Sequence, residues 1–389
     1  MRKIIPLFIL LFIITSANAQ ERVINPGVPF LLVTADARAA GMADIGVATS
    51  ADAFSQQWNP SKYAFATDAQ GFSISYTPYL TDIANDISLG QLTYYQKLND
   101  RSAFAGSLRY FGFGDIELRQ TGDPLEDFPT VSPNEFAIDG SYSLKLSEKF
   151  SMAIAGRFIN SNLKVASDNN DASSASTFAV DVAGFYQSEE IAYNEFNGRW
   201  RAGFNIQNLG PKISYDNDIL NNNFIPANLK IGTGFDFILD DYNKVALNVE
   251  FNKLLVPTPQ DPDLNGDGTV TSEERNQNND DYRSIGWTSG VFRSFGDAPD
   301  GLGEEAKEVT YAVGAEYLYQ NSFAMRLGYF HESPVKGAKQ FFSLGVGFKY
   351  NVVKVDVSYL FSASKVKNPL ENTLRFSLTF NFGEKYDEY

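Results

Sequence analysis

The sequence contains no cysteine and only one histidine, His331. Without cysteine the chain has no disulfide, no thiolate metal site, no thiol nucleophile and no lipid-modified cysteine after an export signal. A hydrolase with an activated serine would have to use His331, which precedes Glu332 and Ser333 at the end of a predicted strand. A loop histidine without a catalytic role fits this position better, so we expect no enzyme activity.

Two pairs of adjacent carboxylates, Glu189–Glu190 and Glu304–Glu305, are the other candidates for acid/base chemistry. Such a pair acts as a dyad only where burial or a neighbouring charge shifts the pKa of one carboxyl. Nothing near either pair in the sequence suggests desolvation. We therefore expect both pairs to lie in solvated loops.

Basic residues are scarce: 32 Lys and Arg stand against 47 Asp and Glu, for a formal net charge of -15. Residues 1–19 combine the basic pair Arg2 and Lys3, an apolar run and the ending Ala-Asn-Ala, which is typical of a cleaved secretory signal peptide. The apolar run is short for a membrane span. Cleavage before Gln20 leaves 30 basic against 47 acidic residues, a charge of -17, and no nucleic acid partner is expected.

A convincing long amphipathic helix is also lacking, and past residue 70 the dominant hydrophobic period is two. In LRFSLTFNF, residues 374–382, apolar and polar side chains alternate as in a strand with one apolar face. Aromatic residues make up 14% of the chain while its mean hydropathy is only -0.23, which suits such strands. About fourteen segments follow the pattern: 71–79, 85–97, 102–113, 135–146, 150–163, 176–187, 199–208, 228–239, 243–253, 308–319, 322–331, 339–350, 353–361 and 372–383.

The connections between these segments fall into two length classes. Those after even-numbered segments are mostly tight, such as LNDR and DDYN, whereas many after odd-numbered segments are long and polar, such as RQTGDPLEDFPTVSP and the region 255–307. Most segments also approach the ~9–11 residues that a tilted strand needs to cross a bilayer. The sequence predicts an all-β fold, a transmembrane antiparallel β-barrel of about 14 strands over 71–383, followed by an acidic tail at 384–389. In it, short turns line the periplasmic rim and long loops are extracellular.

A soluble exported β-sandwich remains the alternative fold, because its strands also alternate apolar and polar residues. Sandwich strands are shorter, at ~5–6 residues, and their loops need not sort into two length classes.

Residues 20–70 do not follow the strand pattern. The stretch 25–63 is rich in Ala, Gly and Ser, which suits close packing in a confined space, yet Phe30 and Trp58 within it need burial. A barrel of about fourteen strands leaves an interior that side chains, a plug or water must fill. We predict that 20–70 forms a hatch-like or plug-like segment in the lumen, with a periplasmic tail as the alternative.

One motif within 255–307 points to a metal ion. In DLNGDGTVTSEE, residues 263–274, oxygen-bearing residues occupy the ligand positions of an EF-hand calcium loop, and Gly268 takes the sixth position, where that loop turns sharply. Prolines before the motif, and the absence of apolar helical spacing after it, argue against a regulatory helix–loop–helix hand. We expect weak, structural Ca²⁺ binding that orders the loop, with a fortuitous loop as the alternative. The predicted ligands are Asp263, Asn265, Asp267, Thr269, Thr271 and Glu274.

Three motifs stand together in the N-terminal segment: PFLL at 29–32, DARAAGMADIGVATSADA at 36–53 and SQQWNP at 55–60. They resemble the start of the PorV (LptO) family, outer-membrane components of the type IX secretion system. Ala40, Ala43 and Ser61 depart mildly from the family pattern, which usually has glycine at the first two positions and alanine at the third. More loosely, the segment is similar to the start of the FadL-like long-chain fatty-acid transporters, which are barrels of about fourteen strands with an N-terminal hatch.

The resemblance implies a function in protein export without bond chemistry. Such proteins accept cargo that carries a C-terminal signal domain from a giant translocon barrel (SprA, also called Sov), and they present it to the sortase PorU. The outward loops would hold the cargo signal, and the lipid-facing wall or loops would dock the translocon. The implied location is the outer membrane of a Gram-negative cell, in contact with its lipid. The wider relatives imply an alternative function, a FadL-like transporter of hydrophobic small molecules.

Overall fold

The computed structural model describes residues 22–81, 84, 86–117, 130–163, 174–215, 222–364, 369–371 and 373–385. The predicted signal peptide at 1–19 lies outside the described residues. So do residues 386–389 of the predicted tail, whereas 384–385 still belong to the last strand.

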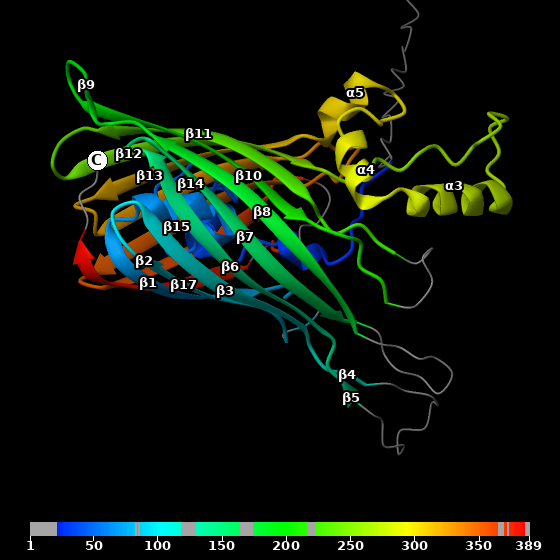
Figure 1. Cartoon of the computed structure of the whole chain (residues 1–389), viewed down its shortest axis with the longest axis horizontal. Coiled ribbons are helices and arrows are strands. Elements are labelled where there is room, and N and C mark those ends of the chain that lie inside the picture. The colour runs from blue at the N-terminus through cyan, green and yellow to red at the C-terminus, as the bar shows by residue number, and fades with distance from the viewer. Residues whose placement is uncertain are drawn as a thin grey trace, which may run out of the picture.

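Fourteen antiparallel strands form a closed barrel, in which each strand pairs with its neighbours in the chain (Figure 1). The ring closes where β1 pairs with β17, for example at Ile74 and Leu378. The predicted barrel is confirmed, and the predicted strand ends agree to within about three residues. The strands are β1 (Asp68–Pro78), β2 (Ile87–Lys97), β3 (Ser102–Phe113), β6 (Asn134–Ser147), β7 (Phe150–Asn162), β8 (Ala175–Gln187), β10 (Asn197–Leu209), β11 (Asn228–Ile238), β12 (Asn243–Leu254), β13 (Thr310–Tyr319), β14 (Phe323–His331), β15 (Gln340–Tyr350), β16 (Val353–Ser362) and β17 (Leu374–Lys385).

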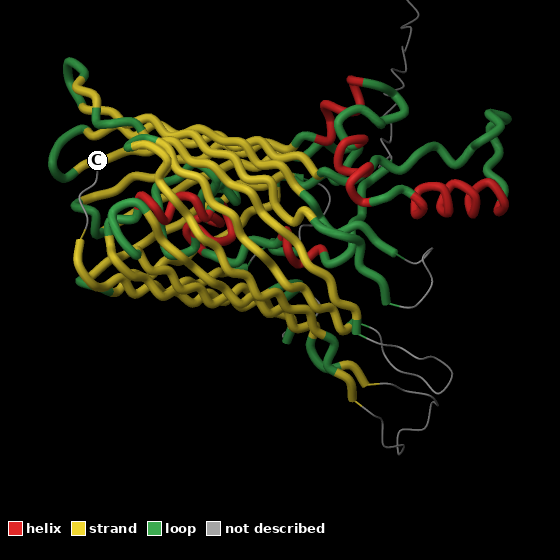
Figure 2. The backbone as a smooth tube through the Cα atoms, in the orientation of Figure 1, coloured by secondary structure: helices red, strands yellow, loops and turns green. Residues whose placement is uncertain are grey.

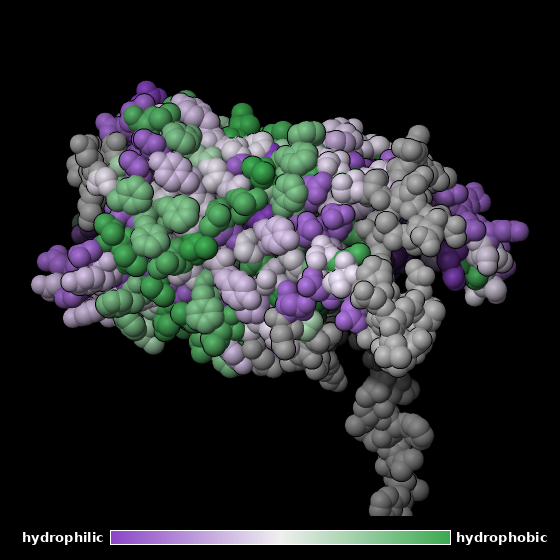
Figure 3. All heavy atoms as spheres, turned by 90° about the horizontal axis from the view of Figure 1, so that it is seen from below, coloured by the Kyte–Doolittle hydropathy of each residue, from purple (hydrophilic) through white to green (hydrophobic). Residues whose placement is uncertain are grey.

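The alternation seen in the sequence sets which face of each strand points outward. In β15, Phe342, Leu344 and Val346 are exposed while Ser343 between them is buried in the interior. Slipping the register by one residue would turn this apolar set into the lumen, so the pattern fixes the register. Figure 3 shows the result, hydrophobic side chains gathered over the barrel wall with hydrophilic ones at its two ends. This apolar band is the surface that meets lipid.

The two rims of the barrel differ as the loop lengths predicted. One rim carries short turns at 98–101, 148–149, 239–242, 320–322 and 351–352, and we call it the short-turn rim. In the turn at 320–322, Gln320 and Asn321 both have positive φ, 52° and 49°, which matches the twist of a tight hairpin. The opposite, loop-bearing rim carries the long connections. Three further short strands lie in connections between barrel strands: β4 (Ile116–Glu117), β5 (Thr130–Val131) and β9 (Ile191–Ala192).

The described helices lie in two places, inside the barrel and in the connection between β12 and β13 (Figure 2). None of them is long and apolar enough to cross a membrane. The interior ones are one or two turns long: η1 (Pro29–Leu32), α1 (Ala37–Ala40), α2 (Ser55–Trp58) and η2 (Pro60–Phe65). The loop helices are α3 (Ser272–Ser284), α4 (Trp287–Arg293), α5 (Leu302–Glu305) and η4 (Ala306–Glu308).

Candidate functional site

The segment from Val28 to Ala66 lies inside the barrel and is mostly buried (Figure 2). Because it has little regular structure, its backbone groups need partners from elsewhere. Inward-facing strand side chains supply them. The Glu250 carboxylate on β12 accepts the N–H groups of Gly46 and Val47 at 2.8 and 2.9 Å. Across the lumen from β12, Arg109 on β3 donates to carbonyls of η1. The hydroxyls of Ser343 on β15 and Ser377 on β17 accept N–H groups of the segment at 2.8 Å.

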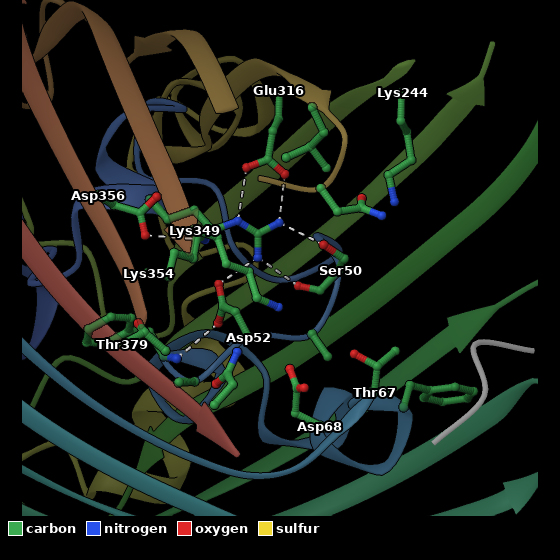
Figure 4. A pocket seen from close by; sticks show the side chains of 18 of the residues that line it. Ser50, Asp52, Thr67, Asp68, Lys244, Glu316, Lys349, Lys354, Asp356 and Thr379 are labelled. Carbon is green, nitrogen blue, oxygen red and sulfur yellow. Dashed lines mark hydrogen bonds and ion pairs between the residues drawn. The ribbon is translucent and has the colours of Figure 1, made fainter. Parts of the chain in front are cut away.

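Arg38 belongs to a buried chain of ion pairs. Figure 4 labels three carboxylates of this chain, Asp52, Glu316 and Asp356. Its guanidinium donates to both Glu316 oxygens, at 3.1 and 2.9 Å, and to Asp52 of the same segment at 2.7 Å. Glu316 also pairs with Arg326, which in turn donates to Asp356 at 2.7 Å. Charges are tolerated at this depth because each one has a partner. The chain of pairs therefore ties the lumen segment to β13, β14 and β16.

A second buried cluster holds the segment from the opposite wall. Arg157 on β7 lies 3.0 Å from Asp139 on β6 and 3.0 Å from Asp181 on β8. Gln56 of α2 joins this cluster, because its Nε2 donates to Asp139 at 2.9 Å and its carbonyl oxygen accepts from the Ser141 hydroxyl at 2.6 Å. The lumen segment is thus fastened at two well-separated positions of the ring.

Glycines in the wall allow the segment to approach it closely. A Cβ atom on Gly328 of β14 would lie 2.3 Å from the Met42 carbonyl carbon and 2.5 Å from the Ala43 nitrogen. At Gly203 of β10, the equivalent atom would lie 2.4 Å from the Val47 oxygen. Since these neighbours are backbone atoms, they have no rotamer with which to move aside. Glycine inside a strand often marks such an approach of another backbone.

A cavity of about 340 Å³ remains between the lumen segment and the wall, near the short-turn rim. Figure 4 shows charged side chains from the segment and from several strands pointing into it. Its charged lining residues are Arg38, Asp52, Asp68, Lys244, Glu316, Lys349, Lys354 and Asp356. An apolar ligand in this cavity would strip water from these groups without replacing their hydrogen bonds, which is costly.

At the loop-bearing rim, one sequence-based expectation is wrong. Glu304 and Glu305 do not lie in a solvated loop, since only 4% and 8% of their surface is exposed. Arg22 donates to both oxygens of Glu304, at 2.9 and 3.0 Å. Lys336 Nζ lies 2.6 Å from Glu304, and Lys253 Nζ lies 2.7 Å from Glu305. The basic partners come from distant parts of the chain, so the neighbouring sequence gave no sign of them. By contrast, the Glu189 side chain is 71% exposed, as expected.

Acidification is expected to loosen this rim cluster. Burial alone would raise the pKa of Glu304, but hydrogen bonds from Arg22 and Lys336 lower that pKa from 4.5 to about 2. A carboxyl with a lowered folded-state pKa contributes stability above its unfolded pKa, and this contribution is lost as the pH falls toward the folded value. The contact between Arg22 and the loop at 300–308 should therefore persist at neutral pH and weaken between pH 4.5 and about 2.

The absence of cysteine makes this prediction easy to measure, because spin labels at Val23→Cys and Ala306→Cys would have no competing thiols. The distribution of distances between the two labels should be narrow at pH 7 and should broaden between pH 4.5 and about 2. Glu304→Gln should broaden it already at pH 7, whereas Glu273→Gln on the exposed α3 should not. A distribution unchanged down to pH 2 would show that the cluster does not hold the loop.

The predicted calcium ligands lie in the exposed stretch before and at the start of α3. The Asp263 carboxylate accepts the N–H groups of Gly266 and Gly268 at 2.8 Å each, and Gly268 has φ 82°, so the expected sharp turn is present. Glu274 instead caps α3, where its Oε2 accepts the Thr271 N–H at 2.9 Å. Among the described residues, no group of three or more Asp, Glu or His side chains is placed to hold a metal ion. Calcium binding stays a prediction.

The helix that follows Thr271 was not predicted from the sequence. The sequence after Thr271 has no apolar helical spacing, yet Ser272–Ser284 is helical and buries none of its residues. The reciprocal capping box between Thr271 and Glu274 starts it without an apolar face.

His331 is the last residue of β14. Its ring stacks on Tyr311 with centroids 4.8 Å apart, and its Nδ1 lies 3.3 Å from the Tyr329 hydroxyl. These aromatic neighbours place it in a packed position at the loop-bearing rim.

Comparison with protein families now adds to this geometry. The family model described as "Type IX secretion system protein PorV" matches residues 16–261, more than half of the chain. The match includes the lumen segment and runs past the end of β12. The chain belongs to the PorV family. The resemblance carried by the N-terminal motifs is confirmed, and residues of these motifs, such as Arg38 and Gln56, contact the barrel wall. Members of this family are components of secretion rather than enzymes.

Among the solved structures that this PorV-family chain resembles are hydrocarbon channels and transporters. The CymD monoaromatic hydrocarbon channel has a TM-score of 0.50 and 14% identity, covering 92% of this chain and 99% of that one. The Ralstonia pickettii toluene transporter TbuX has a TM-score of 0.49 and 11% identity over 89% and 97% of the two chains. A Pseudomonas aeruginosa FadL homologue has a TM-score of 0.43 and 11% identity, covering 90% of this chain and 99% of that one. At such identities the likeness concerns the fold alone. Comparison with curated proteins gave no match.

Sequence reasoning missed most residues that build the interior of the PorV-family chain. Arg38 appeared only as part of a motif, and its partners Glu316 and Arg326 sit in strands where they look like ordinary polar alternation. One signal was available: a charged residue on the inward face of a barrel strand needs a partner inside the lumen. Glycines at inward strand positions, such as Gly203 and Gly328, were a second signal.

Proposed function

We propose that this PorV-family barrel accepts exported cargo bearing a C-terminal signal domain from the translocon barrel, SprA/Sov, and delivers it to the sortase PorU. Membership in the PorV family is the observation that carries the proposal. In this arrangement the loop-bearing rim faces outward and holds the cargo signal, while the apolar wall or its loops dock the translocon in the membrane. The barrel itself makes and breaks no bonds.

The filled lumen supports a route for cargo outside the barrel. The segment 28–66 is fastened to both sides of the ring through Arg38 and Gln56. A protein passing through the lumen would have to displace this segment and leave several buried charges without partners, which is strongly unfavourable. The segment therefore acts as a plug in this proposal.

A FadL-like transporter of hydrophobic small molecules is the alternative, and it draws on the fold that the CymD channel shares. The lumen cavity speaks against it, because charged residues such as Arg38, Glu316 and Asp356 line it. Pockets for apolar ligands are lined mainly by hydrophobic and aromatic side chains.

Deletion of the gene separates the two functions. Under our proposal, deletion abolishes surface display of cargo with C-terminal signal domains, and a plasmid copy of the wild-type chain restores it. Under the alternative, display is normal and only uptake of hydrophobic compounds falls. Affinity purification of tagged protein from native membranes should also recover the translocon barrel and the sortase. Normal cargo display in the deletion strain would overturn the proposal.

We also propose that the stretch from Asp263 to Glu274 binds Ca²⁺ weakly, with a dissociation constant of ~10⁻⁴ to 10⁻³ M as in extracellular modules. Glu274→Gln is expected to weaken binding most, because the twelfth position supplies the bidentate carboxylate in such loops. Glu273→Gln, one residue away and outside the ligand positions, is the matched control. Titration calorimetry on the purified protein measures both, and no heat of binding at millimolar calcium would remove the site.

A further inference from the structure

A second hollow, of about 210 Å³, lies at the loop-bearing rim, away from the lumen cavity. Three parts of the chain that are distant in sequence form its walls: the start of the described chain at 23–25, the connection at 222–224, and the stretch from 259 through α3. Its lining is unusual in composition, because six side-chain amides converge there. They are Asn25, Asn222, Asn223, Gln260, Asn278 and Asn279.

The aromatic residues at this amide pocket hold its walls together. The Tyr282 hydroxyl donates to the Pro257 carbonyl at 3.0 Å, and its ring meets the Phe224 ring edge-on with centroids 5.6 Å apart. The N–H of Gly27 donates to the Phe224 carbonyl at 2.8 Å. Lys212 lies 4.0 Å above the Phe224 ring and donates to the Arg283 carbonyl at 2.7 Å. The pocket is therefore built by contacts between separate segments rather than by one loop.

The amides of the pocket are only partly used by the protein. Asn278 Nδ2 donates to the Gln260 carbonyl at 3.1 Å, and Gln260 Nε2 donates to the Thr258 carbonyl at 2.8 Å. The side-chain amides of Asn25, Asn223 and Asn279, in contrast, make no hydrogen bond within the described part of the chain, so both their donors and their acceptors are available to a ligand.

We propose that this amide pocket binds a neutral saccharide. Each side-chain amide offers both a donor and an acceptor, and sugar hydroxyls offer the same pair, so the two match without a net charge. The partly exposed ring of Tyr282, held in place by Phe224, adds apolar surface on which the C–H face of a sugar can rest. Among the described residues, Arg283 is the only charged one in the lining, so an anionic ligand would find little complementary charge.

An extended peptide fits the pocket less well than a saccharide does. Peptides are usually held as an added strand by backbone groups of a sheet edge, and this lining consists of side chains around a compact hollow. The saccharide could come from lipopolysaccharide or from glycosylated cargo, since both present the same hydroxyl chemistry. This inference goes beyond the proposed function, and binding by the purified protein does not depend on secretion.

Saturation-transfer NMR on the purified full chain tests the proposal, in a detergent without a sugar headgroup. The probes are polysaccharide freed from lipid A, a neutral glycopeptide, and the same peptide without its glycan. We expect saturation transfer to sugar protons of the polysaccharide, the glycopeptide or both, which identifies the source, and none to the bare peptide. Asn223→Ala and Asn279→Ala should each weaken binding about three- to tenfold, the value of one hydrogen bond. Tyr282→Leu should weaken it further.

Asn276→Ala is the matched control, because Asn276 is an exposed residue of α3 outside the pocket lining. All variants should show the same heat-dependent mobility shift of a folded barrel on gels. The proposal is overturned if neither sugar probe binds at tens of millimolar, if the bare peptide binds as well as the glycopeptide, or if Asn276→Ala weakens binding as much as Asn279→Ala. Loss of cargo display with intact saccharide binding, or the reverse, separates this inference from the proposed function.

Discussion

Gly328→Val is expected to expel the lumen segment from the barrel and to open the lumen to ions. The new Cβ alone would lie 2.3 Å from the Met42 carbonyl carbon and 2.5 Å from the Ala43 nitrogen, well inside van der Waals contact. Valine has a high β propensity, so the barrel should still form. Overpacking of this kind typically costs ~1–3 kcal/mol, and more where backbone atoms block relaxation. The clash should displace the lumen segment rather than disrupt the hydrogen bonds between the strands.

Conductance across a planar lipid bilayer measures this opening directly. The wild-type barrel should be nearly silent, and Gly328→Val should give frequent openings. Gly156→Val is the matched control, since it is also a strand glycine but has nothing within 4 Å of the added Cβ. It should leave the barrel closed. Equal conductance of the two variants would mean that close approach at Gly328 does not hold the segment in place.

The second large effect is expected at Arg38. Arg38→Met would leave Asp52 without its cation and Glu316 with Arg326 as its remaining one, and breaking a buried pair from one side costs ~3–5 kcal/mol. Methionine keeps an apolar side chain about as long as the aliphatic stem of arginine, so the loss arises chiefly from the missing guanidinium. We expect a lower unfolding temperature in detergent and faster proteolysis of the segment 28–66.

A double-mutant cycle assigns this loss to the ion pair. Arg38→Met combined with Glu316→Gln should be less destabilised than the sum of the two single changes, by ~1 kcal/mol or more, because both changes remove the same Arg38–Glu316 contact. Arg275→Met on the exposed face of α3 should leave the unfolding temperature unchanged. Strictly additive single effects would argue that Arg38 and Glu316 act independently.

The barrel could be predicted from the sequence because the pattern that specifies each strand lies within that strand. Every second residue of β17 faces lipid and must be apolar, so the pattern in 374–382 is visible without knowledge of the partner strands. The length classes of the connections are equally local. Together they identified a closed fourteen-strand ring and most strand ends to within a few residues.

Contacts inside the barrel could not be predicted in the same way, because the partners are far apart in the sequence. Arg38 and Glu316 are 278 residues apart, and Arg22 and Glu304 are 282 apart. Nothing near Glu304 in the chain marks it as buried. The helix α3 was missed for a different reason, since a capping box and exposed polar residues form a helix that has no apolar stripe to detect.

The position of Arg22 has a consequence for assembly. Arg22 lies at the loop-bearing rim with Glu304, whereas Asp68, where β1 begins, lines the cavity near the short-turn rim. The chain therefore runs the length of the barrel before it makes its first strand. The ring is then sealed by pairing of that first strand with the last, β17. The closed ring therefore surrounds a segment that never touches lipid, and if the seam closed before this segment was inside, the chain would have to enter the lumen through one of the rims.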